Sequence, residues 1–370
     1  MIQSEAMRKY KKTAENGTIK LFHLRLFMNL RARILLCVAL LASSGQVLAD
    51  EPASDDYQLG RGWKIPGTPI RLGGYASLEA EKDRHEPFKI NASDVSLFVW
   101  WEGEGKFRFF SELDLEDALV YEDGKNPTTR HGYLALERAY ADYLYSECLN
   151  FRAGKFLTPI GRWNVIHAEP LVWTTTRPLV TERAFPTNAT GVMAYGTLPV
   201  GDREIDYSVY TALGEDWRPD PKLDPFEEAL GMHVTVPVSS NAEIGVSYAN
   251  FSQHGSNEER KNLLGMDYFW THERYEVSAE LAYRISDEGS ASDESGLFVQ
   301  GVAPLTDRLY VIGRYEWYNP AGPAPAMNIG LLGLAFKLSP AMVFKAEYIH
   351  ASRNTVKEPE GVFTSFAILF

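Results

Sequence analysis

Apolar and polar residues alternate with a period of two in segments of about ten residues, and this pattern strongly limits the possible folds. In the stretch 275–284, for example, Val277 and Leu281 fall on one face, whereas Glu276 and Glu280 fall on the other. Successive side chains of a β-strand point to opposite faces, so each segment predicts a strand with one apolar and one charged face. A strand of this length is long enough to cross a bilayer when tilted. We therefore expect an all-β chain.

Sixteen such segments follow one another along the chain. Their predicted starts lie near Ile70, Lys89, Lys106, Leu134, Leu149, Ala189, Arg203, Glu228, Ala242, Lys261, Tyr275, Ser295, Leu309, Asn328, Met342 and Gly361. Short connections alternate with longer ones, as expected for antiparallel strands with short periplasmic turns on one rim and long extracellular loops on the other. An even strand number is typical of a closed bacterial barrel. The prediction is a transmembrane antiparallel β-barrel of about 16 strands.

The alternation alone does not tell which face points inward. A soluble, secreted β-sandwich would bury its apolar faces and leave the charges outside, and this alternative stays open. Three features favour a barrel with lipid outside: dense charge of both signs on the polar face, aromatic residues near the strand ends, and a last strand that finishes on Phe370. Hydrocarbon offers no hydrogen-bond partner to a free sheet edge, so a sheet in a membrane must close. No stretch after Ala49 is long and apolar enough for a transmembrane helix.

The N-terminus has the pattern of an export signal. A short basic stretch begins at Met28 and is followed by about nine apolar residues and a small-residue cleavage site at Ala49. We expect residues 1–49 to be an upstream extension plus a signal peptide, with Met28 as the start of translation. A short periplasmic segment, 50–67, then precedes the pore domain, 68–370.

The charge balance excludes some classes of partner. The chain contains 37 Lys+Arg and 49 Asp+Glu and has a net charge of −12, which argues against a nucleic-acid partner. Two cysteines cannot form a disulfide framework, and only Cys148 remains after the expected cleavage. The sequence has no HExxH, GxSxG, P-loop or CxxC motif. We therefore predict no enzymatic activity, no cofactor and no metal site.

Four stretches and the C-terminus resemble a known family. The stretches are 136–143, 149–161, 177–183 and 191–196, and the chain ends on Phe370. Together they resemble the outer-membrane porin superfamily, most nearly the phosphate-selective porin O/P family. The resemblance implies an integral outer-membrane homotrimer with an inward-folded third loop, for which the segment 160–188 fits by position. It also implies that Phe370 is the signal read by the barrel assembly machinery.

A loop folded into a sixteen-strand barrel would narrow the channel to a polar constriction, where diameter and charge decide which solutes pass. The candidate constriction residues are Arg162, His167, Glu169, Arg177, Glu182 and Arg183. The alternation predicts a facing pore wall of Arg108, Glu112, Asp114, Arg138, Asp142, Arg152, Arg314, Glu316, Lys345 and Glu347. Acids on one side and bases on the other would set up a transverse field. Each of these charges could equally form a structural ion pair in the lumen.

The predicted function is passive diffusion of small hydrophilic solutes. The resemblance favours anions such as phosphate, which guanidinium groups bind well, whereas the acidic composition favours cations. Acidic outer loops would contact lipopolysaccharide through divalent cations. An outer-membrane enzyme, with Ser, His and acid drawn from different strands, and an occluded structural or adhesive barrel stay open as alternatives.

Overall fold

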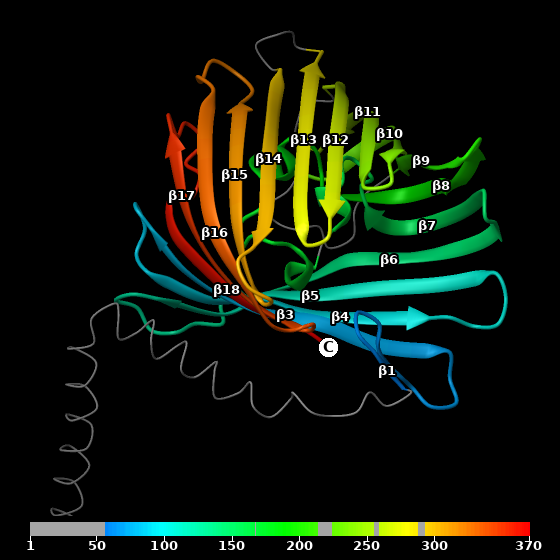
Figure 1. The fold of residues 1–370 in the computed structure, drawn as a ribbon, viewed down its shortest axis with the longest axis horizontal. Coiled ribbons are helices and arrows are strands. Elements are labelled where there is room, and N and C mark those ends of the chain that lie inside the picture. The colour runs from blue at the N-terminus through cyan, green and yellow to red at the C-terminus, as the bar shows by residue number, and fades with distance from the viewer. Residues whose placement is uncertain (1–55, 167, 214–223, 255–258, 288–292) are drawn as a thin grey trace, which may run out of the picture. The chain divides into compact units, whose positions relative to one another are not determined.

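The computed structural model describes residues 56–166, 168–213, 224–254, 259–287 and 293–370, all within one compact unit, Ala53–Phe370. Sixteen antiparallel strands, β3 to β18, pair in sequence order, and β18 pairs back onto β3 (Figure 1). The predicted fold class, a closed barrel of 16 strands, is therefore confirmed. Among the described residues, no helix is both long and apolar enough to cross a membrane.

The strands have the following bounds: β3 Ile70–Asp83, β4 Lys89–Trp101, β5 Phe107–Glu122, β6 Tyr133–Ser146, β7 Leu149–Leu157, β8 Asn188–Val200, β9 Arg203–Leu213, β10 Phe226–Ser239, β11 Ala242–Gln253, β12 Lys261–His272, β13 Tyr275–Ser286, β14 Glu294–Pro304, β15 Leu309–Asn319, β16 Met327–Ser339, β17 Met342–Ser352 and β18 Gly361–Leu369. Each begins within two residues of its predicted start. Two-residue turns such as 201–202 and 240–241 occupy one rim, and the longer connections occupy the other.

The wall has its apolar side chains outside and its charges inside. On β13, Leu281, Tyr283 and Ile285 are 46%, 41% and 46% exposed, whereas Glu280 and Arg284 are each 8% exposed. A water-soluble protein has the opposite distribution. Alternation alone does not tell which face of each strand points inward. In the structure the apolar side chains point outward and the charged side chains point into the lumen.

A short hairpin lies beside the strand that closes the barrel. Strands β1 (Tyr57–Gln58) and β2 (Gly62–Lys64) pair with each other, and β2 pairs with the start of β3. The C-terminal residue, Phe370, exchanges backbone hydrogen bonds with Gly74 of β3 at 2.8 and 2.9 Å. A Cβ at Gly74 would lie 2.0 Å from the carbonyl oxygen of Ser96 and 3.1 Å from the Phe370 ring, so this closure needs glycine.

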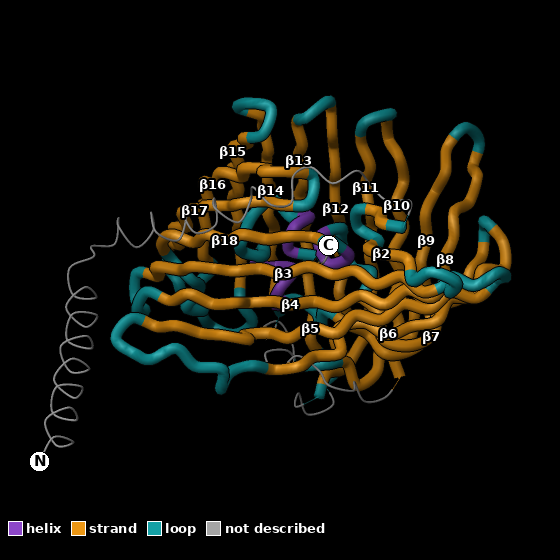
Figure 2. The backbone as a smooth tube through the Cα atoms, turned by 90° about the horizontal axis from the view of Figure 1, so that it is seen from below, coloured by secondary structure: helices purple, strands orange, loops and turns teal. Residues whose placement is uncertain are grey.

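Residues 158–187 leave the wall between β7 and β8 and form three short helices: η1 Trp163–Val165, η2 Glu169–Leu171 and α3 Leu179–Arg183. We call these residues the inner segment. Its helices lie within the outline of the strands in both views (Figure 1 and Figure 2). Ile160, Val180 and Phe185 are buried in a cluster with wall residues such as Phe251 and Phe298. The inner segment therefore packs against inward-facing side chains of the barrel.

Candidate functional site

Carboxylates of the wall accept hydrogen bonds from the backbone of the inner segment. Glu280 of β13 accepts from the backbone N–H groups of Arg162, at 2.8 Å, and Trp163. On β17, Glu347 accepts from the N–H groups of Thr175 and Thr176, both at 2.9 Å. These bonds satisfy N–H groups that have no partner in a regular helix or strand, and an unsatisfied buried N–H is costly.

Wall cations bind the carbonyl oxygens of the same segment. Lys345 donates to the carbonyl oxygens of Glu169 and Thr174, at 3.0 and 3.1 Å. Arg314 donates to the carbonyl oxygen of Thr176 at 2.8 Å. The segment is therefore held through its backbone donors and its backbone acceptors.

Two further charged residues complete this set. Glu316 of β15 accepts from the N–H of Leu179 at 2.7 Å, and Arg284 of β13 donates to the carbonyl oxygen of Ala184 at 3.2 Å. We call the six side chains, which come from β13, β15 and β17 and are all buried, the clamp residues. They are Glu280, Arg284, Arg314, Glu316, Lys345 and Glu347.

The inner segment is also tied to itself. Asn164 donates to the carbonyl oxygens of Thr158 and Thr187, at 2.7 and 3.0 Å, and so joins the two ends of the segment. Arg177 donates to Asn164 and to the carbonyl oxygen of Thr181, the latter at 2.9 Å. The guanidinium group of Arg177 therefore links two parts of the inner segment to each other.

One position in the segment requires glycine. Gly161 has a φ of 65°, in the left-handed region, and a Cβ there would lie 2.3 Å from Oε2 of Glu280. A larger residue would displace the carboxylate that holds the backbone of Arg162 and Trp163. The close approach of backbone and clamp residue thus depends on this glycine.

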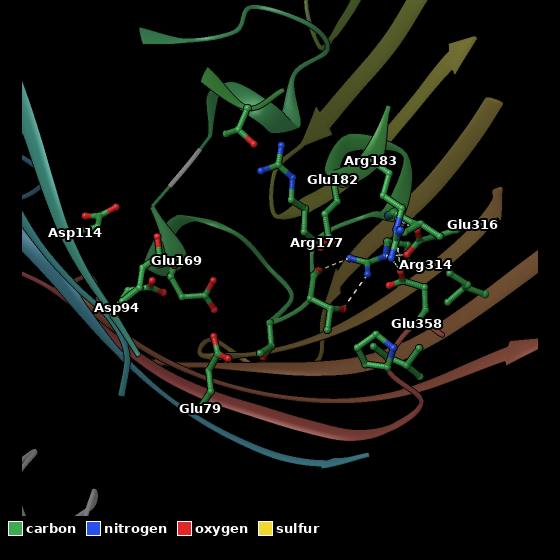
Figure 3. A pocket seen from close by; sticks show the side chains of 18 of the residues that line it. Glu79, Asp94, Asp114, Glu169, Arg177, Glu182, Arg183, Arg314, Glu316 and Glu358 are labelled. Atoms are coloured by element: carbon green, nitrogen blue, oxygen red, sulfur yellow. Dashed lines mark hydrogen bonds and ion pairs between the residues drawn. The ribbon is translucent and has the colours of Figure 1, made fainter. Parts of the chain in front are cut away.

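A cavity of about 720 Å³ lies between the inner segment and the opposite part of the wall. Five carboxylates from four neighbouring strands line it there, and we call them the acidic wall. They are Glu79 of β3, Asp94 of β4, Asp114 and Glu116 of β5, and Glu137 of β6. Figure 3 shows Glu79, Asp94 and Asp114 on one side of the cavity, with Arg177, Arg183 and Arg314 on the other.

An irregularity in strand pairing increases the density of acids in this wall. Between β5 and β6, Glu112 pairs with Arg138 but Leu113 pairs with Leu136, so Glu137 is an extra residue in β6. Strict alternation would send Glu137 and Arg138 to opposite faces, whereas a bulge lets both point the same way. Glu137 lines the large cavity and Arg138 forms an ion pair with the buried Glu112. The bulge therefore adds a carboxylate that alternation does not predict.

The arginines opposite the acidic wall already have partners. Arg314 forms an ion pair with Glu316 at 2.7 Å, and Arg183 forms one with Glu358, from the loop between β17 and β18, at 2.9 Å. Burial raises the pKa of Glu358 to about 7, an effect to which the neighbouring Glu182 adds. Burial also raises the pKa of Glu169 to about 7, although its contact with Lys345 opposes the rise.

Four predicted constriction residues line the cavity together: Glu169, Arg177, Glu182 and Arg183. Arg162 lies apart from them, with its guanidinium carbon 3.7 Å from the centre of the Phe269 ring and an ion pair to Glu243 at 3.1 Å. His167 lies outside the described residues.

The predicted wall residues divide into three groups. Asp114 and the clamp residues Arg314 and Glu316 line the large cavity, whereas the clamp residues Lys345 and Glu347 bind the inner segment without lining it. A third group forms ion pairs or turn contacts nearer the rim of two-residue turns: Glu112 with Arg138, Asp142 with Arg152 at 2.8 Å, and Arg108 with the carbonyl oxygens of Gly103 and Gly105. Arg138 and Arg152 also border a second cavity of about 370 Å³.

Sequence reasoning missed four members of the acidic wall. Glu79 and Glu116 have the polar-face positions that alternation predicts, and Glu116 follows Asp114 by two residues, so extending the pattern along β3 and β5 would have found them. Asp94 and Glu137 carry no such signal, because each lies at a shift in strand pairing, Asp94 on β4 and Glu137 on β6.

His233, Ser247 and Asp267 lie close together in the lumen, but not in the arrangement of a catalytic triad. Ser247 Oγ lies 2.8 Å from Nδ1 of His233, and Asp267 Oδ2 lies 3.9 Å from the same nitrogen. Nε2 of His233 contacts Thr235 instead, at 2.9 Å. In a catalytic triad the nucleophile and the acid contact opposite nitrogens of the imidazole. This cluster therefore does not activate Ser247.

Sequence comparison relates the chain to an uncharacterized protein. No family model matches the chain. An uncharacterized protein of Aquifex aeolicus (strain VF5) is 24% identical in an alignment that covers 83% of this chain and 79% of that protein.

Similar solved structures are outer-membrane proteins, among them a channel and an anion-selective porin. The channel DcaP of Acinetobacter baumannii has a TM-score of 0.58 and 13% identity, covering 84% of this chain and 100% of its own. OmpT of Vibrio cholerae has a TM-score of 0.58 and 9% identity, covering 85% and 100%. An anion-selective porin from Comamonas acidovorans has a TM-score of 0.57 and 12% identity, covering 81% and 98%. The chain thus has the fold of the outer-membrane porins.

Proposed function

We propose that the protein is an outer-membrane porin through which small hydrophilic solutes diffuse passively. The observation that carries this proposal is the reversed wall, with apolar side chains outside and charges inside a closed sheet of 16 strands. An apolar outer surface suits lipid, and barrels of this strand number are wide enough for an aqueous channel. The porin fold of DcaP and of the anion-selective porin supports the same reading.

In this proposal the inner segment is the inward-folded third loop, and it narrows the channel. Its backbone is held by clamp residues on β13, β15 and β17, and the large cavity lies between the segment and β3 to β6, with Arg314 and Glu316 of β15 also in its lining. Solutes would pass between the inner segment and the acidic wall. Four predicted constriction residues, among them Glu169 and Arg177, line this cavity.

The remaining sequence-based expectations are part of the same proposal. Residues 1–49 would be removed on export, and Phe370, which closes the barrel against Gly74, would be the residue that the barrel assembly machinery reads. A homotrimer fits the trimer form described for OmpT of Vibrio cholerae. Long loops rich in acids would contact lipopolysaccharide. The contacts of His233 lack the arrangement of a catalytic triad and so give the enzyme alternative no support.

The proposal is tested by reconstituting the mature protein in liposomes and measuring swelling in sugars of increasing size. A porin should admit the small sugars and exclude the larger ones, because the inner segment limits the diameter. Liposomes that carry heat-unfolded protein are the control. Absence of swelling with correctly folded protein would refute diffusion and support the alternative of an occluded barrel.

A further inference from the structure

We propose that the passage selects for cations over anions through the charge of its lining. This inference rests on the proposed function and deepens it, since it names the class of solute that the same passage favours. The class comprises small inorganic cations and small organic ammonium compounds. Phosphate, which the family resemblance suggests, would then be disfavoured.

The first step is the balance of charge around the cavity of about 720 Å³. Among the described residues that line it, nine are Asp or Glu and three are Arg. Beyond the five carboxylates of the acidic wall, the acids are Glu169, Glu182, Glu316 and Glu358. A concave surface that carries an excess of one sign attracts ions of the opposite sign, and low-dielectric walls strengthen the effect.

The second step concerns the arginines. Arg314 directs its guanidinium donors to Glu316 and to Thr174 and Thr176 of the inner segment. The donors of Arg177 go to Asn164 and Thr181. A phosphate or carboxylate is recognised when paired N–H donors point at its oxygens. These two arginines keep the segment in place and do not form an anion cradle.

Arg183 is the third arginine of the lining. Its Nε and Nη2 atoms donate to the same oxygen of Glu358, at 3.1 and 2.9 Å, so the guanidinium is engaged side-on by a carboxylate. An incoming anion would have to displace Glu358 from it. The three arginines thus add positive charge to one side of the passage without offering a ready anion site.

The third step is the placement of the acids. The acidic wall draws on four consecutive strands, β3 to β6, and stands opposite the arginines (Figure 3). Among the described residues, no three His, Cys, Asp or Glu side chains converge closely enough to hold a metal ion. We therefore infer selection by the electric field along this wall, with cations passing close to it and without a tight cation site.

The inference is tested by recording single channels in planar bilayers under a gradient of KCl. For the unmodified protein we expect a reversal potential of cationic sign, with K⁺ favoured over Cl⁻ by up to about tenfold, the low end of what a charged cleft achieves. Tetramethylammonium chloride should give the same sign. A reversal potential of zero or of anionic sign would overturn the inference. Because this test uses the unmodified protein, it does not depend on the folding of a variant.

A pair of variants locates the effect. Glu79→Gln with Asp94→Asn removes two acids of the acidic wall, and we expect the preference for K⁺ to fall severalfold. Glu147→Gln with Asp206→Asn removes the same charge beside the second cavity, and should leave most of the preference. Equal effects of the two double variants would overturn the assignment to the acidic wall.

The two proposals fail in different ways. If the protein gives no current steps at all, the porin function fails. If steps occur but carry no cation preference, the porin function stands and the inference about its lining is wrong.

Discussion

The two sides of the lumen use inward-facing charges in opposite ways. On β13, β15 and β17, buried carboxylates and cations bind the backbone of the inner segment. On β3 to β6, carboxylates such as Asp94 and Glu137 face the cavity. The same sequence pattern of polar residues on alternate positions produces both. What separates them is whether the inner segment or the cavity lies against the wall.

The difference predicts where the structure tolerates substitution. A charge that binds a buried backbone group and a buried counter-ion cannot be removed without leaving its partners unsatisfied. A charge that lines the cavity without binding the backbone of the inner segment adds mainly to the local field. Stability should therefore depend on the clamp residues, and ion selectivity on the acidic wall.

The largest effect is expected from Arg314→Met. The substitution preserves bulk but leaves the buried Glu316 without its cation and removes three bonds to Thr174 and Thr176. Breaking a buried pair in this way costs about 3–5 kcal/mol. The measurement is the temperature at which the folded, fast-migrating form disappears on gels, which should fall clearly.

The matched control for Arg314→Met is Arg152→Met on the other side of the barrel. Arg152 lies nearer the rim of two-residue turns. Its guanidinium group donates two hydrogen bonds to Asp142, and neither of them goes to the inner segment. It should lower the stability of the barrel without changing single-channel conductance. If Arg314→Met also left conductance unchanged, the clamp would not position the segment.

A smaller loss is expected from Glu347→Gln. The backbone N–H groups of Thr175 and Thr176 each donate to one carboxylate oxygen of Glu347, both at 2.9 Å. The side chain of Gln replaces one of these oxygens with an NH₂ group, so one of the two N–H groups loses its acceptor. One buried donor left unsatisfied costs about 1–3 kcal/mol. We expect noisier open-channel current, since this part of the segment loses a restraint.

Glu116→Gln, in the acidic wall, serves as the comparison. It removes one of several like charges and should change stability by less than about 0.5 kcal/mol, with quiet current and a lower preference for cations. Equal noise in the two variants would remove the distinction between the two sides of the lumen.

The closed barrel could be predicted almost completely from the sequence, whereas the different roles of its inward-facing charges could not. Alternation is a local signal, so every strand start was found within two residues. The path of the inner segment depends on bonds between distant residues, such as Thr175 with Glu347, which are 172 positions apart. No local pattern encodes such a contact. The inward turn of Glu137 likewise depends on a one-residue shift in the pairing of β5 with β6.

The cation preference should also depend on pH near neutrality. The pKa values of Glu169 and Glu358 are both raised to about 7, in each case chiefly by burial. Each carboxyl is neutral below that pH and charged above it, so the lining gains negative charge between pH 6 and pH 8. The ratio of K⁺ to Cl⁻ permeability should rise over this interval. Reversal potentials at pH 6, 7 and 8 test this, and Glu358→Gln should reduce the change; a flat profile would contradict it.

A small effect on stability is also expected from Arg183→Met. The Arg183 side chain is 42% exposed, and ion pairs of this kind contribute about 0–1 kcal/mol. The positive charge of Arg183 lowers the pKa of Glu358, so without it that carboxyl should ionise at a higher pH. At pH 7 Glu358 is about half ionised, so its extra protonation offsets at most about half of the lost positive charge in the lining. Selectivity should therefore move slightly toward cations at pH 7 and further toward cations at higher pH. A large shift at pH 7 would mean that Arg183 acts on passing ions directly, as an anion-attracting residue of the constriction.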